Sequence, residues 1–113
     1  MSNRELFLTY LRHYARKDLA QVSAMFADDI RLRDWNISVS GKSAAVSETE
    51  KNFASADSIE IRALAIHESP GSVAGELRIL VDQTIELYVV DVAEFDSGGK
   101  ITAIRAYLGR SDQ

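Results

Sequence analysis

With 113 residues, 46% of them hydrophobic, and one proline, the chain suits a single compact domain over residues 1–113 with a sizeable hydrophobic core. The formal net charge is −4 and Lys and Arg are scattered along the chain, which argues against binding to nucleic acid or to an anionic membrane surface. The absence of cysteine excludes disulfides, thiolate zinc sites and cysteine nucleophiles, and without a recognisable signal peptide or membrane-spanning run the default expectation is a cytoplasmic protein.

Two helices are predicted at the start of the chain. Ser2 and Glu5 form a capping box ahead of apolar residues at helical spacing. That apolar face consists of Leu6, Phe7, Tyr10, Leu11 and Tyr14. Asp18 and Gln21 repeat the capping pattern before a second, shorter apolar stripe, so a second helix follows the first closely.

The middle of the chain predicts one strand and one more helix. Residues 30–35 alternate as a strand, and residues 36–41 are typical of a strand or a loop. Residues 42–54 form a weakly amphipathic pattern that predicts a third helix.

After Asp57 the apolar pattern changes to period two. It predicts strands at about residues 58–67, 72–81, 84–95 and 100–108, separated by turns that contain Pro-Gly, Asp-Gln and Gly-Gly pairs. Helices followed by an antiparallel sheet indicate an α+β fold, with the helices packed on one face of a curved sheet.

Asp91 lies in the middle of the apolar strand "LYVVDVAEF". Side chains alternate between the faces of a strand, so Asp91 shares a face with Leu87, Val89, Ala93 and Phe95. A carboxyl group in such surroundings needs a partner or keeps its proton, because desolvation penalises the charged form. Asp91 is therefore a candidate functional acid.

Two segments carry a resemblance to a known superfamily. "MFADDIRLRD" (residues 25–34), preceded by Tyr10, and "VVDVAEFDSGGKITAIRAY" (residues 89–107) resemble the nuclear transport factor two-like superfamily, and within it the ketosteroid isomerase-like, or SnoaL-like, proteins. The resemblance implies a cystatin-like cone, in which three N-terminal helices pack on the concave face of a curved antiparallel sheet.

The same resemblance implies three catalytic residues. Ketosteroid isomerases use a tyrosine on the first helix, an aspartate after the first strand and an aspartate on a late strand, and Tyr10, Asp34 and Asp91 match these positions. Asp34 is then the base that moves a proton, and Tyr10 with protonated Asp91 holds the oxygen of the enolate.

The chain also departs from the isomerase pattern. The loop after Asp34 is short, Trp35 stands where a proline is usual, and Phe26 stands where a tyrosine supports the oxyanion tyrosine. A weak catalyst on steroids is therefore expected.

A small apolar substrate or ligand is the expected partner, and neither a cofactor nor a metal is expected. The predicted pocket wall consists of Phe26, Trp35, Leu77, Ile79, Val89, Ile104 and Ala106. Three alternatives remain open: a polyketide cyclase or dehydratase-like enzyme, a non-catalytic binding module for a small apolar ligand, and a protein-interaction module.

A homodimer is expected through the convex face of the sheet. The strand that bears Asp91 is apolar on its other face too, through Tyr88, Val90 and Val92. Because the helices cover only one side of the sheet, a second copy of the chain is predicted to cover this face.

Overall fold

The computed structural model describes residues 1–110 and contains three helices. Their bounds are α1 Asn3–Ala15, α2 Leu19–Met25 and α3 Lys42–Ser55. The predicted capping box is present at the start of α1, where Ser2 and Glu5 exchange hydrogen bonds. Asp18 caps α2 through its side chain, and α3 starts after Gly41, whose φ of 94° favours glycine.

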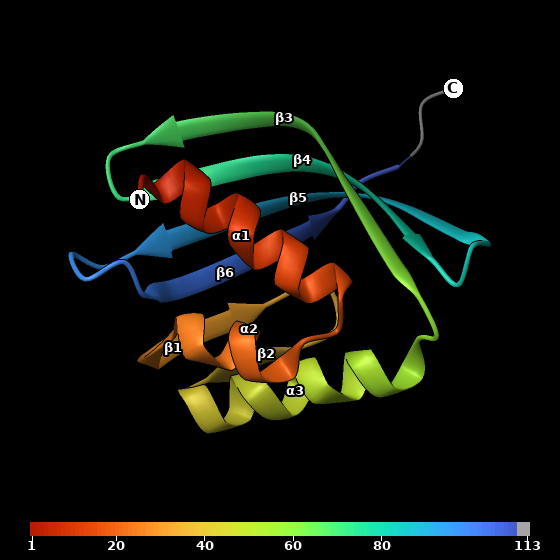
Figure 1. Ribbon diagram of the computed structural model, residues 1–113, viewed down its shortest axis with the longest axis horizontal. Helices are drawn as coiled ribbons and strands as arrows, with labels where there is room; N and C mark the ends of the chain where they lie inside the picture. Colours follow the sequence, from red (N-terminus) through yellow and green to blue (C-terminus); the bar gives the residue numbers. More distant parts are fainter. Residues whose placement is uncertain (111–113) are drawn as a thin grey trace.

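Six strands form one sheet in the order β2-β1-β6-β5-β4-β3 (Figure 1). Their bounds are β1 Phe26–Arg33, β2 Ser38–Ser40, β3 Ile59–Ser69, β4 Ser72–Val81, β5 Ile85–Phe95 and β6 Ile101–Leu108. All neighbouring pairs are antiparallel except β1 and β6, which are parallel. The antiparallel arrangement predicted for the strands after Asp57 is confirmed in β3–β6. The parallel pairing of β1 with β6 was not predicted, because alternation of apolar residues gives the face of a strand but not the direction of its neighbour.

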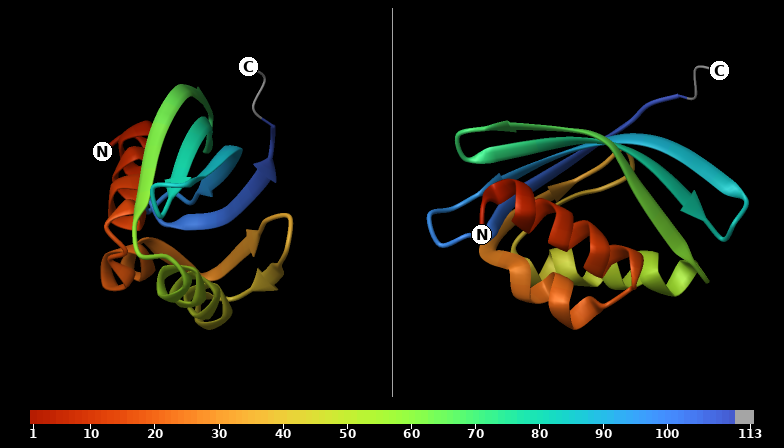
Figure 2. Two further views of the ribbon diagram at one scale, coloured as in Figure 1. Left: turned by 90° about the vertical axis from the view of Figure 1, so that its right-hand side faces the viewer. Right: turned by 45° about the horizontal axis from the view of Figure 1, so that its top comes forward.

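The sheet is strongly curved, and the helices lie on its concave side (Figure 2). Irregular register accompanies this curvature: Leu64 is an extra residue between paired Ala63 and Ala65 of β3, and register also shifts along β1 and at the end of β5. Bulges of this kind bend a strand and increase its twist. The predicted α+β cone with helices on the concave face is confirmed.

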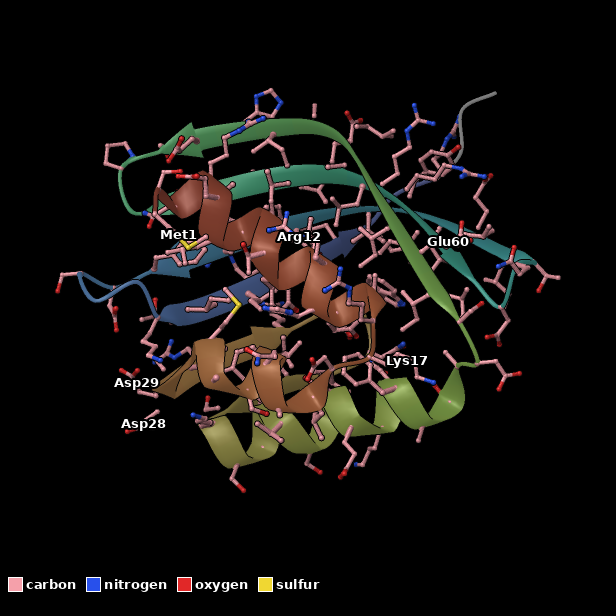
Figure 3. The ribbon with its side chains drawn as sticks, viewed as in Figure 1. Met1, Arg12, Lys17, Asp28, Asp29 and Glu60 are labelled. Carbon is pink, nitrogen blue, oxygen red and sulfur yellow. The ribbon has the colours of Figure 1, made fainter. Side chains whose placement is uncertain are left out.

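Strand β1 begins four residues earlier than the sequence pattern predicts. Helix α2 ends at Met25, and Phe26 already has extended backbone and pairs with Ile101 of β6. The sequence pattern misses this start because Asp28 and Asp29 interrupt the alternation of apolar and polar residues. Both are exposed, and Figure 3 shows them at the edge of the fold, pointing away from its body.

Helix α1 and the end of α3 are tied together beside the sheet. Lys17 follows α1 with a φ of 57°, and its ammonium donates a hydrogen bond to the carbonyl of Ala56, the residue directly after α3. Figure 3 shows Lys17 at the junction of α1 and α2, near α3. This contact fixes the helices around the space that they enclose with the sheet.

Candidate active site

A cavity of about 250 Å³ lies between helices α1 and α3, the loop after β1 and the concave face of the sheet. Its walls differ in chemistry. The sheet contributes apolar side chains, which are Leu32, Ile59, Ile61, Ile79, Val81, Leu87, Val89, Ile104 and Ala106. Helix α3 contributes polar ones, which are Glu48, Thr49, Asn52 and Ser55. The cavity can therefore enclose an apolar body and still meet polar groups on one side.

Tyr10, Asp34 and Asp91 all line this one cavity. They come from α1, from the end of β1 and from β5, so three distant parts of the sequence meet there. Five of the seven residues expected in the wall also line it: Trp35, Ile79, Val89, Ile104 and Ala106.

Phe26 and Leu77 are corrections to the expected wall. Both are fully packed in the hydrophobic core and are not among the residues that line the cavity. Leu77 has the predicted strand phase, but phase places a side chain on a face without saying whether other side chains cover it. At that part of the face, α1 packs against the sheet.

Asp91 points to the concave side of β5, as its strand phase predicts, and is 9% exposed. Its carboxyl group makes no hydrogen bond with another residue in the described range 1–110, although its backbone is paired with Gly75 of β4 and Ala106 of β6. Burial, together with the nearby charge of Asp34, raises the pKa of Asp91 from 3.8 to about 7. Near neutral pH a substantial fraction of this acid is protonated and can donate a hydrogen bond into the cavity.

Gly75 brings α1 close to Asp91. It pairs with Asp91 across β4 and β5, and a Cβ atom on Gly75 would lie only 2.6 Å from Cε2 of the Phe7 ring. The ring of Phe7 thus occupies the space that a side chain at position 75 would need. Tyr10 is one helical turn after Phe7, and it lines the same cavity as Asp91.

Tyr10 is held by aromatic packing rather than by hydrogen bonds. It is 4% exposed, and its ring centroid lies 5.8 Å from that of Tyr14 and 6.4 Å from that of Phe26. Burial, followed by the nearby Tyr14 and Asp91, raises the pKa of Tyr10 well above its ordinary value. Its hydroxyl is therefore a neutral donor, and it has no hydrogen-bond partner among residues 1–110.

Asp34 lies in the loop between β1 and β2 in surroundings opposite to those of Asp91. Its Oδ1 atom accepts hydrogen bonds from the backbone N–H groups of Asn36, at 2.7 Å, and Ile37, at 2.9 Å. Such donors stabilise an ionised carboxylate. Its Oδ2 atom accepts none from the described part of the chain, so that oxygen is available to take a proton.

Sequence reasoning missed two polar residues of the site, Tyr14 and Asn52. The Nδ2 atom of Asn52 donates a hydrogen bond to the hydroxyl of Tyr14 at 3.1 Å, and both residues line the cavity. Tyr14 belongs to the predicted apolar stripe of α1, four residues after Tyr10, which is a usable signal. The sequence gives no such signal for Asn52, because a polar residue on a weakly amphipathic helix is ordinarily solvated.

The arrangement combines one carboxyl group that accepts two backbone hydrogen bonds with several neutral donors in a mostly apolar enclosure. Such a site can remove a proton from a substrate while it stabilises negative charge that develops on a nearby oxygen. Within residues 1–110, no group of three or more His, Asp or Glu side chains is placed to hold a metal ion.

Comparison with known proteins gives a family match and a set of structural neighbours. Residues 7–104 match the model of the SnoaL-like domain. A putative ketosteroid isomerase from Kribbella flavida has a TM-score of 0.84 at 13% identity, covering 98% of this chain and 80% of that one. An NTF2-like protein of unknown function from Cytophaga hutchinsonii has a TM-score of 0.82 at 12% identity, covering 96% and 91%.

A third neighbour is SalBIII, an epoxide hydrolase/cyclase-like enzyme with a role in pyran ring formation in the polyether salinomycin. Its TM-score is 0.83 at 20% identity, over 97% of this chain and 92% of that one. At such identities these likenesses establish the nuclear transport factor two-like fold. No curated protein matches the sequence. No helix in the described part of the chain has the length and apolar character to cross a membrane.

Proposed function

The chain belongs to the SnoaL-like domain family, and we propose that it is a ketosteroid isomerase-like enzyme. It shifts a double bond next to the ketone of a small apolar, steroid-like or cyclic enone substrate. Asp34 is the general base, and Tyr10 and Asp91 form the oxyanion hole. The reaction needs neither a cofactor nor a metal.

The proposed reaction moves one proton between two carbon atoms of the same molecule. Oδ2 of Asp34 removes the proton between the ketone and the double bond of a β,γ-unsaturated ketone, and the C–H electron pair becomes part of a dienolate. Hydrogen bonds from Tyr10 and protonated Asp91 stabilise the negative oxygen. Protonated Asp34 then returns the proton to the γ-carbon, which gives the conjugated ketone and restores the carboxylate.

The observation that carries the proposal is the contrast between the two aspartates in one cavity. Asp34 accepts two backbone hydrogen bonds, whereas Asp91 is buried without a partner in residues 1–110 and its pKa is raised to about 7. Paired carboxyl groups in unlike surroundings divide the roles of base and acid.

Turnover of a β,γ-unsaturated cyclic ketone tests the proposal. The conjugated product absorbs in the ultraviolet, so wild-type protein can be compared with Asp34→Asn in one continuous assay. Formation of the conjugated ketone by the wild type, and its loss in the variant, is the expected result. If the wild type converts no such ketone yet binds phenols, the non-catalytic binding module replaces the enzyme.

A second candidate reaction is the opening of an epoxide by water or by a hydroxyl group of the same substrate. The polar wall of α3 favours it, because Asn52 and Ser55 can hold a water or hydroxyl nucleophile, and SalBIII is epoxide hydrolase/cyclase-like. Asp91 would then give a proton to the epoxide oxygen while Asp34 takes one from the nucleophile. Conversion of a small cyclic epoxide, without conversion of the ketone, would select this reaction.

We also propose that the chain forms a homodimer through the convex face of the sheet. Val90 and Tyr107 pair across β5 and β6 on that face and are 39% and 55% exposed. Apolar side chains in such a patch favour burial against a partner. Equilibrium sedimentation at micromolar concentration is expected to give a dimer, and a monomer would contradict the proposal.

A further inference from the structure

The Tyr14–Asn52 pair lies in the cavity wall but takes no part in the proposed proton transfer. Tyr14 comes from α1 and Asn52 from α3, and their hydrogen bond joins the two helices. The ring of Tyr14 is fixed by its neighbours, with its centroid 4.8 Å from that of Phe53 in an edge arrangement and 5.8 Å from that of Tyr10. The position of its hydroxyl is therefore defined by packing.

The direction of this hydrogen bond leaves one donor and one acceptor unused. Since the Tyr14 oxygen accepts from Asn52, its own proton is free to be donated elsewhere, and no other described residue receives it. The Oδ1 atom of Asn52 likewise has no donor among residues 1–110. A hydroxyl group can use both, because it both donates and accepts.

Tyr14 also stays protonated next to the catalytic acids. Burial raises the pKa of Tyr14, the hydrogen bond from Asn52 acts in the opposite direction, and the charges of Asp91 and Asp34 raise it further. Tyr14 lines the same cavity as Tyr10, Asp34 and Asp91, so one small ligand can contact its hydroxyl together with that of Tyr10.

The size and polarity of the rest of the cavity limit which ligands could present a hydroxyl group to Tyr14 and Asn52. A 150 Å³ cavity holds benzene, so about 250 Å³ accommodates roughly ten non-hydrogen atoms. Of the proposed substrates, this volume favours a small cyclic enone over a whole steroid. The sheet wall favours a flat apolar body. Its Ile79 and Val89 side chains face a helix wall that includes Asn52, so the polar edge of the molecule belongs on the α3 side.

We propose that the Tyr14–Asn52 pair recognises a second oxygen of the substrate, a hydroxyl group distinct from the reacting carbonyl. The substrates are then small cyclic ketones that carry a hydroxyl group, rather than ketones without any further polar group. This inference rests on the proposed function for the identity of the reacting carbonyl, but the recognition itself is a matter of binding alone.

The test uses 2-naphthol and the dihydroxynaphthalenes that share its 2-hydroxyl group as probes. Dissociation constants are measured for the wild type and for Tyr14→Phe, Asn52→Leu and the control Glu50→Gln, which changes an exposed residue of α3 outside the cavity. The readout is the ratio of the two affinities within each protein, which a general structural effect of the substitution leaves unchanged.

At least one dihydroxynaphthalene is expected to bind the wild type about 2- to 10-fold more tightly than 2-naphthol, the value of one net hydrogen bond. Tyr14→Phe and Asn52→Leu should bring this ratio close to one, whereas Glu50→Gln should retain it. The proposal is overturned if no probe binds, if no second hydroxyl improves binding, or if the gain persists in both variants.

Turnover separates this inference from the proposed function. If the second hydroxyl improves binding but no ketone is isomerised, the isomerase proposal fails and the recognition point stands as part of a binding site. If ketones with and without the additional hydroxyl group are isomerised with equal KM, the isomerase proposal stands and the proposed recognition of a hydroxyl group fails.

Discussion

Asp34 and Asp91 are the same side chain in opposite surroundings, and both line one cavity. Asp34 lies in a loop and accepts two backbone hydrogen bonds. Asp91 lies in the middle of β5 among apolar neighbours, and its pKa is raised to about 7. The difference shows how a fold places one residue type in two environments. A loop supplies free backbone N–H groups to a carboxyl group, whereas the N–H groups of a paired strand are already used within the sheet.

The largest expected effect comes from removing Asp34, the proposed base. Asp34→Asn keeps the shape of the side chain but not its basicity, so kcat for a β,γ-unsaturated ketone should fall about 10²- to 10⁴-fold. Binding of a planar phenol, measured by titration, should change little because the donors to its oxygen remain. Equal losses in kcat and in phenol affinity would contradict the assignment of Asp34 as a base.

The pH dependence of stability should separate the two aspartates. Because the folded-state pKa of Asp91 is raised from 3.8 to about 7, the unfolded chain loses this proton more readily than the folded one. The contribution of Asp91 to stability is then fully present below about pH 4 and is lost as the pH rises through about 7, by about 4 kcal/mol at most.

Urea unfolding of the wild type and Asp91→Asn at pH 4 and pH 8 measures this effect. The variant carries no titrating group at position 91, so the free energy of unfolding of the wild type should fall relative to that of the variant between the two pH values. A difference between the two proteins that is the same at pH 4 and pH 8 would show that Asp91 titrates as an ordinary acid.

Loss of either oxyanion donor should weaken catalysis and ligand binding together. Tyr10→Phe keeps the aromatic packing but removes a donor, and Asp91→Ala removes the other. Each is expected to lower kcat about 10²- to 10³-fold and also to weaken binding of a phenol, whose ionised form resembles the enolate. Retention of phenol affinity in both variants would separate these residues from the oxyanion.

The smallest effect tests how the fold positions Tyr10 next to Asp91. A Cβ atom at position 75 would lie 2.6 Å from Cε2 and 2.8 Å from Cζ of Phe7, so Gly75→Ala forces the ring and α1 to shift. It should cost about 1–3 kcal/mol of stability and lower kcat. Gly98→Ala is the matched control, because its Cβ would meet only Asp96 Oδ1, at 3.4 Å. Equal unfolding midpoints for the two variants would contradict this role of Gly75.

Much of the fold follows from the sequence because its signals are local. Capping at Ser2 and Asp18 predicts where helices begin, and the period of two predicts the strands and the face to which Asp91 points. The parallel pairing of β1 with β6 and the early start of β1 at Phe26 depend on contacts between distant segments, which no local pattern carries.

The cavity was predictable in part for the same reason. Strand phase and the family resemblance lead to Tyr10, Asp34 and Asp91, which come together in the structure. The burial of Phe26 and Leu77 in the core and the hydrogen bond from Asn52 to Tyr14 depend on how α1 and α3 pack. Such packing depends on how side chains from different helices and strands fit together, and a single sequence does not show that fit.

The protonation state of Asp91 tests the account most directly. Carbon-13 NMR of protein labelled in its aspartate carboxyl groups follows each acid as the pH changes, and the signal missing from Asp91→Asn identifies Asp91. This carboxyl group is expected to titrate near pH 7, so that a substantial fraction of it is a hydrogen-bond donor at neutral pH. Titration near pH 4 would mean that Asp91 is ionised at neutral pH, and the proposed division of roles between the two aspartates would be wrong.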